Sequence, residues 1–285
     1  MTARKVMIVT DSTSDIPPDA LGELPIKVVP LKIEIGDRVF RDMVDLSREE
    51  FLEHLKTGEM PRTSQPSVGE FQTVFNELIG QGYDVVAIHI SPKLSGTFNS
   101  ATTAARNLGN EHLTIIDSGS VSIGLGVLVL YAAELAAAGH NADEIRERVE
   151  SRKSGVWVVA VIETLEYLRR GGRIGAASAF LGSALQIKPV IQVKDGEILP
   201  LERVRTFKRG LERMLALTNE HAPFDRLAVL HLGAPEGAAR LIDQLRERQP
   251  NTEILLGQMG TVVGTYGGPG IMGVAGLISE RDSSS

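Results

Sequence analysis

The first half of this chain alternates between short apolar runs and amphipathic segments, and this alternation constrains the fold more than any other feature. The apolar runs have the length of strands and cover Val6–Thr10, Val28–Ile35, Val85–Ile90 and Leu113–Ile116. The segments with helical periodicity cover Arg48–Leu55, Val68–Gly80, Thr97–Leu108 and Val121–Ala138. Strands that alternate with helices predict a parallel sheet with helices on both faces. We therefore expect a three-layer α/β/α domain over residues 1–153.

The second half has a different pattern, which favours a mixed sheet. Asp195-Gly196 stands between two alternating runs, Pro189–Val193 and Ile198–Val204, and this dipeptide is a strong signal for a hairpin. Further strands are expected at Trp157–Ile162, Arg226–Leu232 and Ile254–Gln258, with helices at Thr206–Glu220 and Pro235–Arg248. We expect a two-layer α/β domain with a mixed sheet over residues 154–285.

One apolar segment, Val121–Gly139, has nearly the length of a membrane span. It contains Ser122 and Glu134, and polar turns flank it closely, so we interpret it as a buried helix rather than a membrane span. Gly124 and Gly126 would let another backbone, or a ligand chain, approach this helix closely.

Composition excludes several classes of protein. The chain of 285 residues has 36 acidic and 30 basic residues, a net charge of −6, without the basic stripe that nucleic acid requires. There are no cysteines, so disulfides, thiol catalysis and thiolate metal sites are excluded. The six histidines do not pair at metal-ligand spacing, and we expect no metal or cofactor. The N-terminal apolar run is too short for a secretory signal, so a cytoplasmic location is expected.

Two polar junctions are suited to hold an anion. Ser95, Gly96 and Thr97 lie between a strand signal and a helix signal, where the free N–H groups and partial positive charge of a helix start favour negative ligands. A second junction, Pro61–Ser67, also precedes a helix signal. Neither junction combines a nucleophile with a base, a metal cluster or an acid pair. These junctions indicate a protein that holds an acidic small molecule.

Two other segments allow more than one interpretation. Asp11–Asp15 follows the first strand and either caps the next helix or binds a cation or activates water. Gly264–Gly270 is either a tight turn or a place where a ligand approaches the backbone, with the Tyr266 hydroxyl in the site. Gly171–Gly175 lacks the ending and spacing of a P-loop, and no kinase glycine loop is present.

Taken in order along the chain, these stretches resemble the DegV family, whose members include the fatty-acid-binding subunits of bacterial fatty acid kinase. The resemblance rests on Val9–Asp15, Pro61–Ser67, Leu94–Phe98, Asp117-Ser118, Gly124–Gly126, Leu168–Ile174, Arg203–Phe207 and Gly267–Gly270. It implies a two-domain α/β protein that grips one long-chain fatty acid, such as palmitate, between its domains. A protein of this kind is a non-catalytic carrier in phospholipid metabolism. It presents the carboxylate to a separate ATP-dependent kinase subunit, which forms the acyl phosphate.

The resemblance also implies roles for individual residues. Thr63 and Ser95 would hold the carboxylate, and Gly96 and Thr97 would complete that pocket. Tyr266 stands where family members often carry a histidine of the carboxylate network, and tyrosine donates a hydrogen bond without titrating near neutral pH. Arg173 and Arg205 would face the kinase. Gly124 and Gly126 would lie near the acyl chain.

A second interpretation belongs to a different class. The chain would then be an enzyme acting on a small acidic or phosphorylated metabolite, with the Asp11–Asp15 turn as its acid/base or metal site. A DNA-binding regulator conflicts with the acidic charge balance. Transient contact with a membrane surface is compatible with a fatty acid carrier.

Overall fold

The computed structural model describes residues 4–181 and 187–280 and places a four-stranded parallel sheet, sheet A, in the N-terminal half. Its strand order is β2 (Ile26–Val29), β1 (Lys5–Asp11), β6 (Tyr83–His89) and β7 (Leu113–Asp117). Strands β1 and β6 are almost wholly buried, as expected of strands covered on both faces. The predicted parallel sheet is confirmed.

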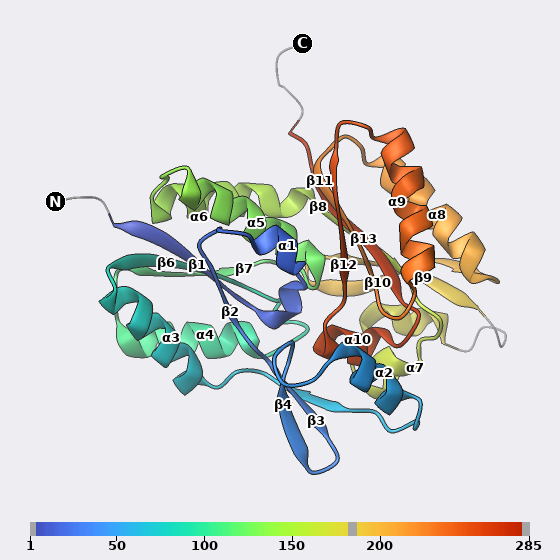
Figure 1. Ribbon diagram of the computed structural model, residues 1–285, viewed down its shortest axis with the longest axis horizontal. Coiled ribbons are helices and arrows are strands. Elements are labelled where there is room, and N and C mark those ends of the chain that lie inside the picture. The colour runs from blue at the N-terminus through green and yellow to red at the C-terminus, as the bar shows by residue number, and fades with distance from the viewer. Residues whose placement is uncertain (1–3, 182–186, 281–285) are drawn as a thin grey trace.

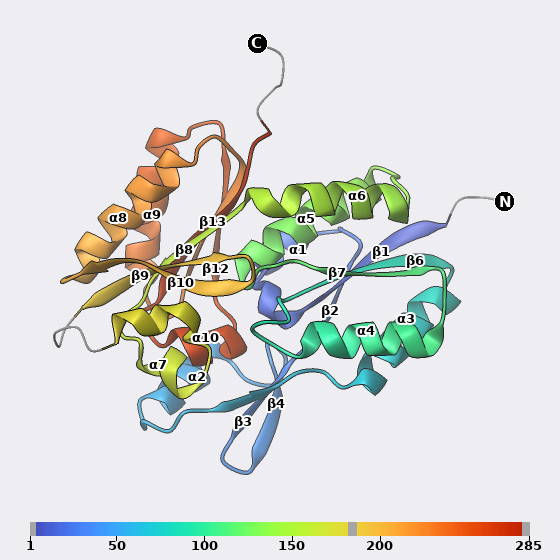
Figure 2. The same cartoon turned by 180° about the vertical axis from the view of Figure 1, so that it is seen from behind.

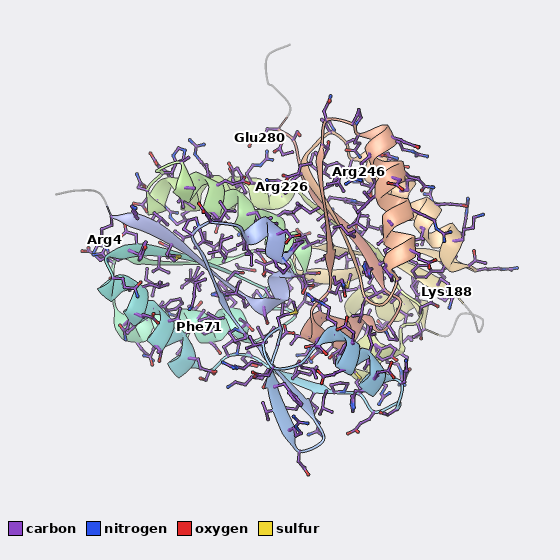
Figure 3. All side chains as sticks on the ribbon, viewed as in Figure 1. Arg4, Phe71, Lys188, Arg226, Arg246 and Glu280 are labelled. Carbon is purple, nitrogen blue, oxygen red and sulfur yellow. The ribbon has the colours of Figure 1, made fainter. Side chains whose placement is uncertain are left out.

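Helices cover both faces of sheet A. Helices α3 (Val68–Gly80) and α4 (Thr97–Leu108) pack on one face, and α5 (Ile123–Ala137) and α6 (Ala142–Arg152) pack on the other (Figure 1). The starts of α3 and α6 are both closed by capping boxes, Ser67 with Glu70 and Asn141 with Glu144. Beneath sheet A, Phe71 of α3 is fully buried, 5.6 Å from the Phe75 ring (Figure 3).

The run predicted as one strand over Val28–Ile35 is two strands, and this prediction was wrong. Pro30 lies between β2 and β3 (Lys32–Ile35), and β3 belongs to a separate sheet. This small antiparallel sheet B has the order β4 (Arg38–Arg41), β3 and β5 (Arg62–Ser64). Proline lacks the N–H that a continuous ladder requires, which explains the break. Along the chain, helix α1 (Pro18–Leu21) precedes β2, and helix α2 (Arg48–Leu55) follows β4.

The C-terminal half forms a six-stranded mixed sheet, sheet C, as predicted. Its order is β10 (Glu197–Val204), β9 (Lys188–Lys194), β8 (Val156–Val161), β13 (Met272–Ile278), β11 (Phe224–His231) and β12 (Glu253–Gln258). Only the β11–β12 pair is parallel. The predicted hairpin turn joins β9 to β10, with Asp195 and Gly196 both at positive φ, as a type I′ turn requires.

Helices cover sheet C on one face, and helix α5 covers the other. Helices α8 (Phe207–Glu220) and α9 (Pro235–Arg248) lie on the first face, while α5 packs on β8, β11 and β13 as well as on β1 (Figures 1 and 2). Most of α5 is therefore buried between the two sheets, which explains why its sequence is apolar apart from Glu134. Arg226 of β11 donates to Glu134 of α5 at 2.6 Å, which adds a polar contact across this junction (Figure 3).

The remaining elements are short and lie around the junction of the sheets. They are α7 (Glu166–Arg170), α10 (Thr261–Gly267) and the 3₁₀ turns η1 (Ser12–Ser14), η2 (Lys153–Gly155) and η3 (Gly175–Phe180). Helix α10 packs on α7, and both views place them on the same side of the molecule (Figures 1 and 2). Sheet C begins just after η2, near the predicted boundary between residues 153 and 154. One core cluster includes residues of both halves, so the division into two domains stays a prediction.

Candidate functional site

A largely apolar cavity lies at the junction of the two halves. The space between its walls is about 940 Å³, which includes open solvent at its mouth. Most of its apolar lining comes from sheet C, α10 and the start of α5, including Ile123, Val158, Ile191, Leu230, Val262 and Ile271. Leu31, Ile90 and Leu94 of the N-terminal half and Leu168 of α7 also line it. Its polar lining residues are Thr13, Thr63, Ser95, Ser122, Arg173 and Tyr266. The cavity therefore suits a ligand that is mostly apolar.

Two hydroxyls from opposite ends of the sequence meet at this cavity. Thr63 lies on β5, and Tyr266 lies in the last turn of α10. The Thr63 Oγ1 and Tyr266 OH oxygens are 2.5 Å apart. Either hydroxyl can donate to the other, and the one that accepts keeps its own O–H free to donate to an anionic ligand. Both predicted residues line the cavity, and the structure brings them together. Tyr266 belongs to helix α10, which ends at Gly267, and a turn at Pro269-Gly270 follows before the final strand. Because Tyr266 and Gly267 line the cavity, the geometry favours the ligand-lining interpretation of Gly264–Gly270.

The other predicted hydroxyls lie at the start of α4. Ser95 lines the cavity, its Oγ is 2.9 Å from Thr97 Oγ1, and it accepts the Thr97 N–H at 3.3 Å. Thr97 is fully buried behind Ser95 and is not part of the lining. Gly96 is covered by another side chain, because a Cβ there would lie 2.8 Å from Gln65 Nε2. Ser95 is thus the member of this group that faces the cavity.

Arg173 lines the same cavity, whereas the family resemblance predicts a partner-facing surface for it. Its guanidinium carbon lies 4.9 Å from the centre of the Tyr266 ring. Its Nε donates to the Leu94 carbonyl at 3.1 Å, and another nitrogen donates to the Gly171 carbonyl at 2.8 Å. Arg173 thereby joins the α4 turn to α10. It also places a positive charge beside the hydroxyl pair, which favours an anionic head group.

Arg205 lies elsewhere, at an exposed position just after β10. It lines a surface hollow with Glu202, Val204 and Thr206, and with three other arginines, Arg203, Arg209 and Arg213. The two arginines predicted for the kinase-facing surface therefore belong to different sites. The hollow carries a local excess of positive charge on a chain whose net charge is −6.

Gly124 and Gly126 allow protein, rather than ligand, to approach α5. A Cβ on Gly124 would lie 2.4 Å from a methyl carbon of Val158 on β8. A Cβ on Gly126 would lie 2.6 Å from the Ser14 carbonyl oxygen in η1. Neither glycine lines the cavity, although Ile123 beside Gly124 does. Their place near an acyl chain stays a prediction, and their close approach holds α5 against both halves.

The Asp11–Asp15 turn is buried and hydrogen-bonded within the protein. Asp11 Oδ1 accepts the Thr13 N–H, and Asp11 Oδ2 accepts the Ile90 N–H and lies 3.0 Å from His89 Nδ1. Asp15 adopts φ 50° and accepts from Ser122 at 2.6 Å. These contacts satisfy turn backbone and buried polar groups, so the geometry favours the structural interpretation of this turn.

A second buried carboxylate, Asp42, lies near Asp15 and is not predicted from the sequence. Asp42 accepts the Thr261 N–H at 3.0 Å, and Asp15 accepts the Gly260 N–H at 2.8 Å. Burial raises the pKa of both carboxyls, that of Asp15 to about 7. Nothing in the sequence pairs Asp42 with Thr261, because 219 positions separate them.

The described residues also bear on metal binding and on membrane insertion. Across residues 4–181 and 187–280, no three His, Asp or Glu side chains gather in a way that could hold a metal ion. No helix within those ranges is long and apolar enough to cross a membrane.

Comparisons with known proteins show the family to which this chain belongs. A family model described as "Uncharacterised protein, DegV family" matches residues 5–278. A DegV domain-containing protein of Streptomyces coelicolor is 38% identical over 284 residues, covering 98% of this chain and 100% of the relative.

Two solved structures share the fold and carry names that state a ligand. A DegV family protein of Thermus thermophilus, described by its fatty acid binding, superposes with a TM-score of 0.90 at 34% identity, covering 96% of this chain and all of that one. DegV of Bacillus subtilis, described as a fatty acid binding protein, gives a TM-score of 0.87 at 32% identity, covering 97% of this chain and all of that one.

Proposed function

We propose that this chain, which belongs to the DegV family, binds one long-chain fatty acid in the cavity at the junction of its halves. The observation that carries the proposal is the combination of apolar walls with one polar cluster. Thr63, Ser95, Tyr266 and Arg173 supply hydroxyl donors and a positive charge, and these suit a carboxylate. The solved relatives described as fatty acid binding proteins support the same ligand class.

The apolar walls would supply most of the affinity. Each buried methylene stabilises binding by ~0.8 kcal/mol, so about fifteen methylenes give a gross ~12 kcal/mol before ordering costs are subtracted. A hydrogen bond to a charged carboxylate adds ~1.5–3 kcal/mol. Burial of the acyl chain therefore retains the ligand, while Thr63, Ser95 and Tyr266 select and orient its head group.

The direct test is extraction of the purified, undialysed protein with organic solvent, followed by mass spectrometry. One equivalent of a long-chain fatty acid such as palmitate is the expected result, and its length reports the chain preference. Protein that contains no fatty acid and fails to take up added palmitate would contradict the proposal. The small-metabolite enzyme would then become the leading interpretation.

The family resemblance extends the proposal to a non-catalytic carrier in the cytoplasm. It would present the carboxylate to a separate ATP-dependent kinase that forms acyl phosphate for phospholipid metabolism. The arginine-lined hollow around Arg205 is the surface that we assign to that partner. Arg173 lies at the cavity and would act on the head group itself.

A pair of variants tests this assignment in a reaction with a cognate kinase and ATP. Arg205→Ala should lower the rate of acyl phosphate formation while leaving fatty acid affinity unchanged. Arg240→Ala, at an exposed position on α9, serves as the matched control and should change neither quantity. Equal rates for the two variants would contradict the placement of the partner at this hollow.

A further inference from the structure

Helix α10 belongs to the C-terminal half, but two buried carboxylates of the N-terminal half hold its start. Asp15 accepts the Gly260 N–H at 2.8 Å. Asp42 accepts the Thr261 N–H at 3.0 Å and the Thr261 hydroxyl at 2.7 Å, and the Val262 N–H lies 3.4 Å away. The first N–H groups of a helix lack partners within it, so these carboxylates complete the hydrogen bonding of α10.

The other end of α10 is also held by the N-terminal half, through the head-group site. Thr63 lies 2.5 Å from the Tyr266 hydroxyl in the last turn of the helix. Between these two ends, Val262 and Val263 line the cavity, and Gly267 follows Tyr266 in the lining. Helix α10 is therefore one wall of the cavity, joined to the opposite half by polar contacts at its two ends.

We propose that Asp15 and Asp42 are positioning residues for ligand retention. By holding the start of α10 against the N-terminal half, they fix Tyr266 opposite Thr63 and keep the cavity closed around its ligand. Release of the ligand then requires the bonds from Asp15 and Asp42 to α10 to break. The inference rests on the proposed function for the nature of the ligand, although the contacts exist without it.

The surroundings of Asp15 make this closure sensitive to pH. Asp15 is 4% exposed, and burial raises the pKa of its carboxyl to about 7, against the opposing hydrogen bonds from Ser122 and Gly260. Two charged groups of other elements act on it: Asp42 after β4, which raises the pKa, and Arg48 of α2, which lowers it.

Two histidines lie in the same region. His231 ends β11, and burial and Arg48 both lower its pKa, so it is neutral near pH 7. His89 is paired with Asp11 on the far side of the turn. Burial raises the pKa of both carboxyls at the start of α10, and that of Asp15 lies near neutral pH.

The direction of the pH effect follows from the two states of Asp15. Opening exposes the Asp15 carboxyl to water and returns its pKa from about 7 toward 3.8. At a pH between these two pKa values, opening therefore releases a proton from Asp15. Acid therefore favours the closed state. If opening limits release, ligand dissociation should be about tenfold slower at pH 6 than at pH 8.

The kinetic test measures release of a naturally fluorescent polyene fatty acid into excess phosphatidylcholine vesicles, between pH 6 and pH 8. Wild type and Asp19→Asn, an exposed control on α1, should both show the tenfold slowing toward acid. Asp15→Asn keeps an uncharged acceptor and should release slowly at every pH. The same ligand is used with all three proteins, so a difference between their pH profiles reports a change in the protein. A wild-type pH profile in Asp15→Asn would overturn the proposal.

A second measurement needs no ligand and separates failure of this inference from failure of the proposed function. Amide hydrogen exchange across residues 259–267 should give protection factors that rise from pH 8 to pH 6 in wild type and stay constant in Asp15→Asn. Asp42→Ala should lose protection in this segment, and Asp42→Asn, which keeps an acceptor for Thr261, should restore it. Equal protection in Asp42→Ala and wild type would overturn the positioning role even if fatty acid binds.

Discussion

Replacement of Tyr266 by phenylalanine tests whether the polar cluster selects the head group while burial of the acyl chain supplies most of the affinity. The substitution removes one hydroxyl, which lies 2.5 Å from Thr63 Oγ1. It leaves the ring beneath the Arg173 guanidinium and against Gly171, so the wall of the cavity keeps its shape. The half-buried Thr63 hydroxyl can exchange its lost partner for water, so the fold should be little affected.

The expected magnitude follows from the charge of the ligand. A hydrogen bond to a carboxylate contributes ~1.5–3 kcal/mol, so the dissociation constant for palmitate should rise by about 10–150-fold. The bond to a neutral alcohol is worth ~1 kcal/mol, so binding of the alcohol with the same chain should weaken by only about fivefold. Shortening either ligand by two methylenes should cost ~1.6 kcal/mol in wild type and variant alike.

The assay is competition against a fluorescent fatty acid, with palmitate, hexadecanol and their shorter analogues as competitors. Thr63→Val and the double variant complete a cycle, and the two losses should be less than additive because the hydroxyls act as a pair. An unchanged ratio of acid to alcohol affinity in Tyr266→Phe would refute the assignment of Tyr266 to the head group. A change in the binding free energy per methylene between wild type and Tyr266→Phe would refute the independence of acyl-chain binding from head-group binding.

Three further outcomes are expected. Ser95→Ala should lower the preference for acid over alcohol more than it lowers retention of lipid during purification, and protein that purified wholly free of lipid would contradict this. Gly126→Ala should destabilise the fold by ~1–3 kcal/mol in urea unfolding, because the new Cβ would meet the Ser14 carbonyl at 2.6 Å. Gly80→Ala, where a Cβ meets nothing within 4 Å, is its control, and equal effects would refute the packing argument. The folded state of ligand-free protein holds the Asp15 proton up to about pH 7 while the unfolded state releases it near 3.8, so stability should fall, by at most ~4 kcal/mol, as pH rises across that window. Asp15→Asn should remove that component of the pH dependence, and an unchanged slope would show that Asp15 is not its source.

Local patterns in the sequence predicted much of the architecture. Alternating strand and helix signals predicted sheet A, and capping boxes close the starts of α2, α3 and α6 in the structure. The Asp195-Gly196 turn predicted the β9–β10 hairpin. Each of these features depends on neighbouring residues, because backbone periodicity, caps and turn conformations are set within a few positions of the chain.

Sequence pattern was misleading where the choice of partner strand decided the outcome. The apolar run over 28–35 has the composition of one strand, yet its two parts enter different sheets on either side of Pro30. Helix α5 was correctly expected to be buried, but only the packed structure shows that two sheets bury it. Apolar composition predicts that a segment is buried, but it does not predict which surface of the protein covers it.

The sequence by itself determined which hydroxyls are suited to an anion, because residue type, neighbouring helix signals and the family resemblance together point to Thr63, Ser95 and Tyr266. The tertiary structure decided how they meet: Thr63 and Tyr266 are 203 positions apart and share one hydrogen bond. It also brought Arg173 to the cavity and placed Asp15 and Asp42 at the start of α10. Contacts of this kind depend on how the two halves pack, and no local propensity encodes that packing.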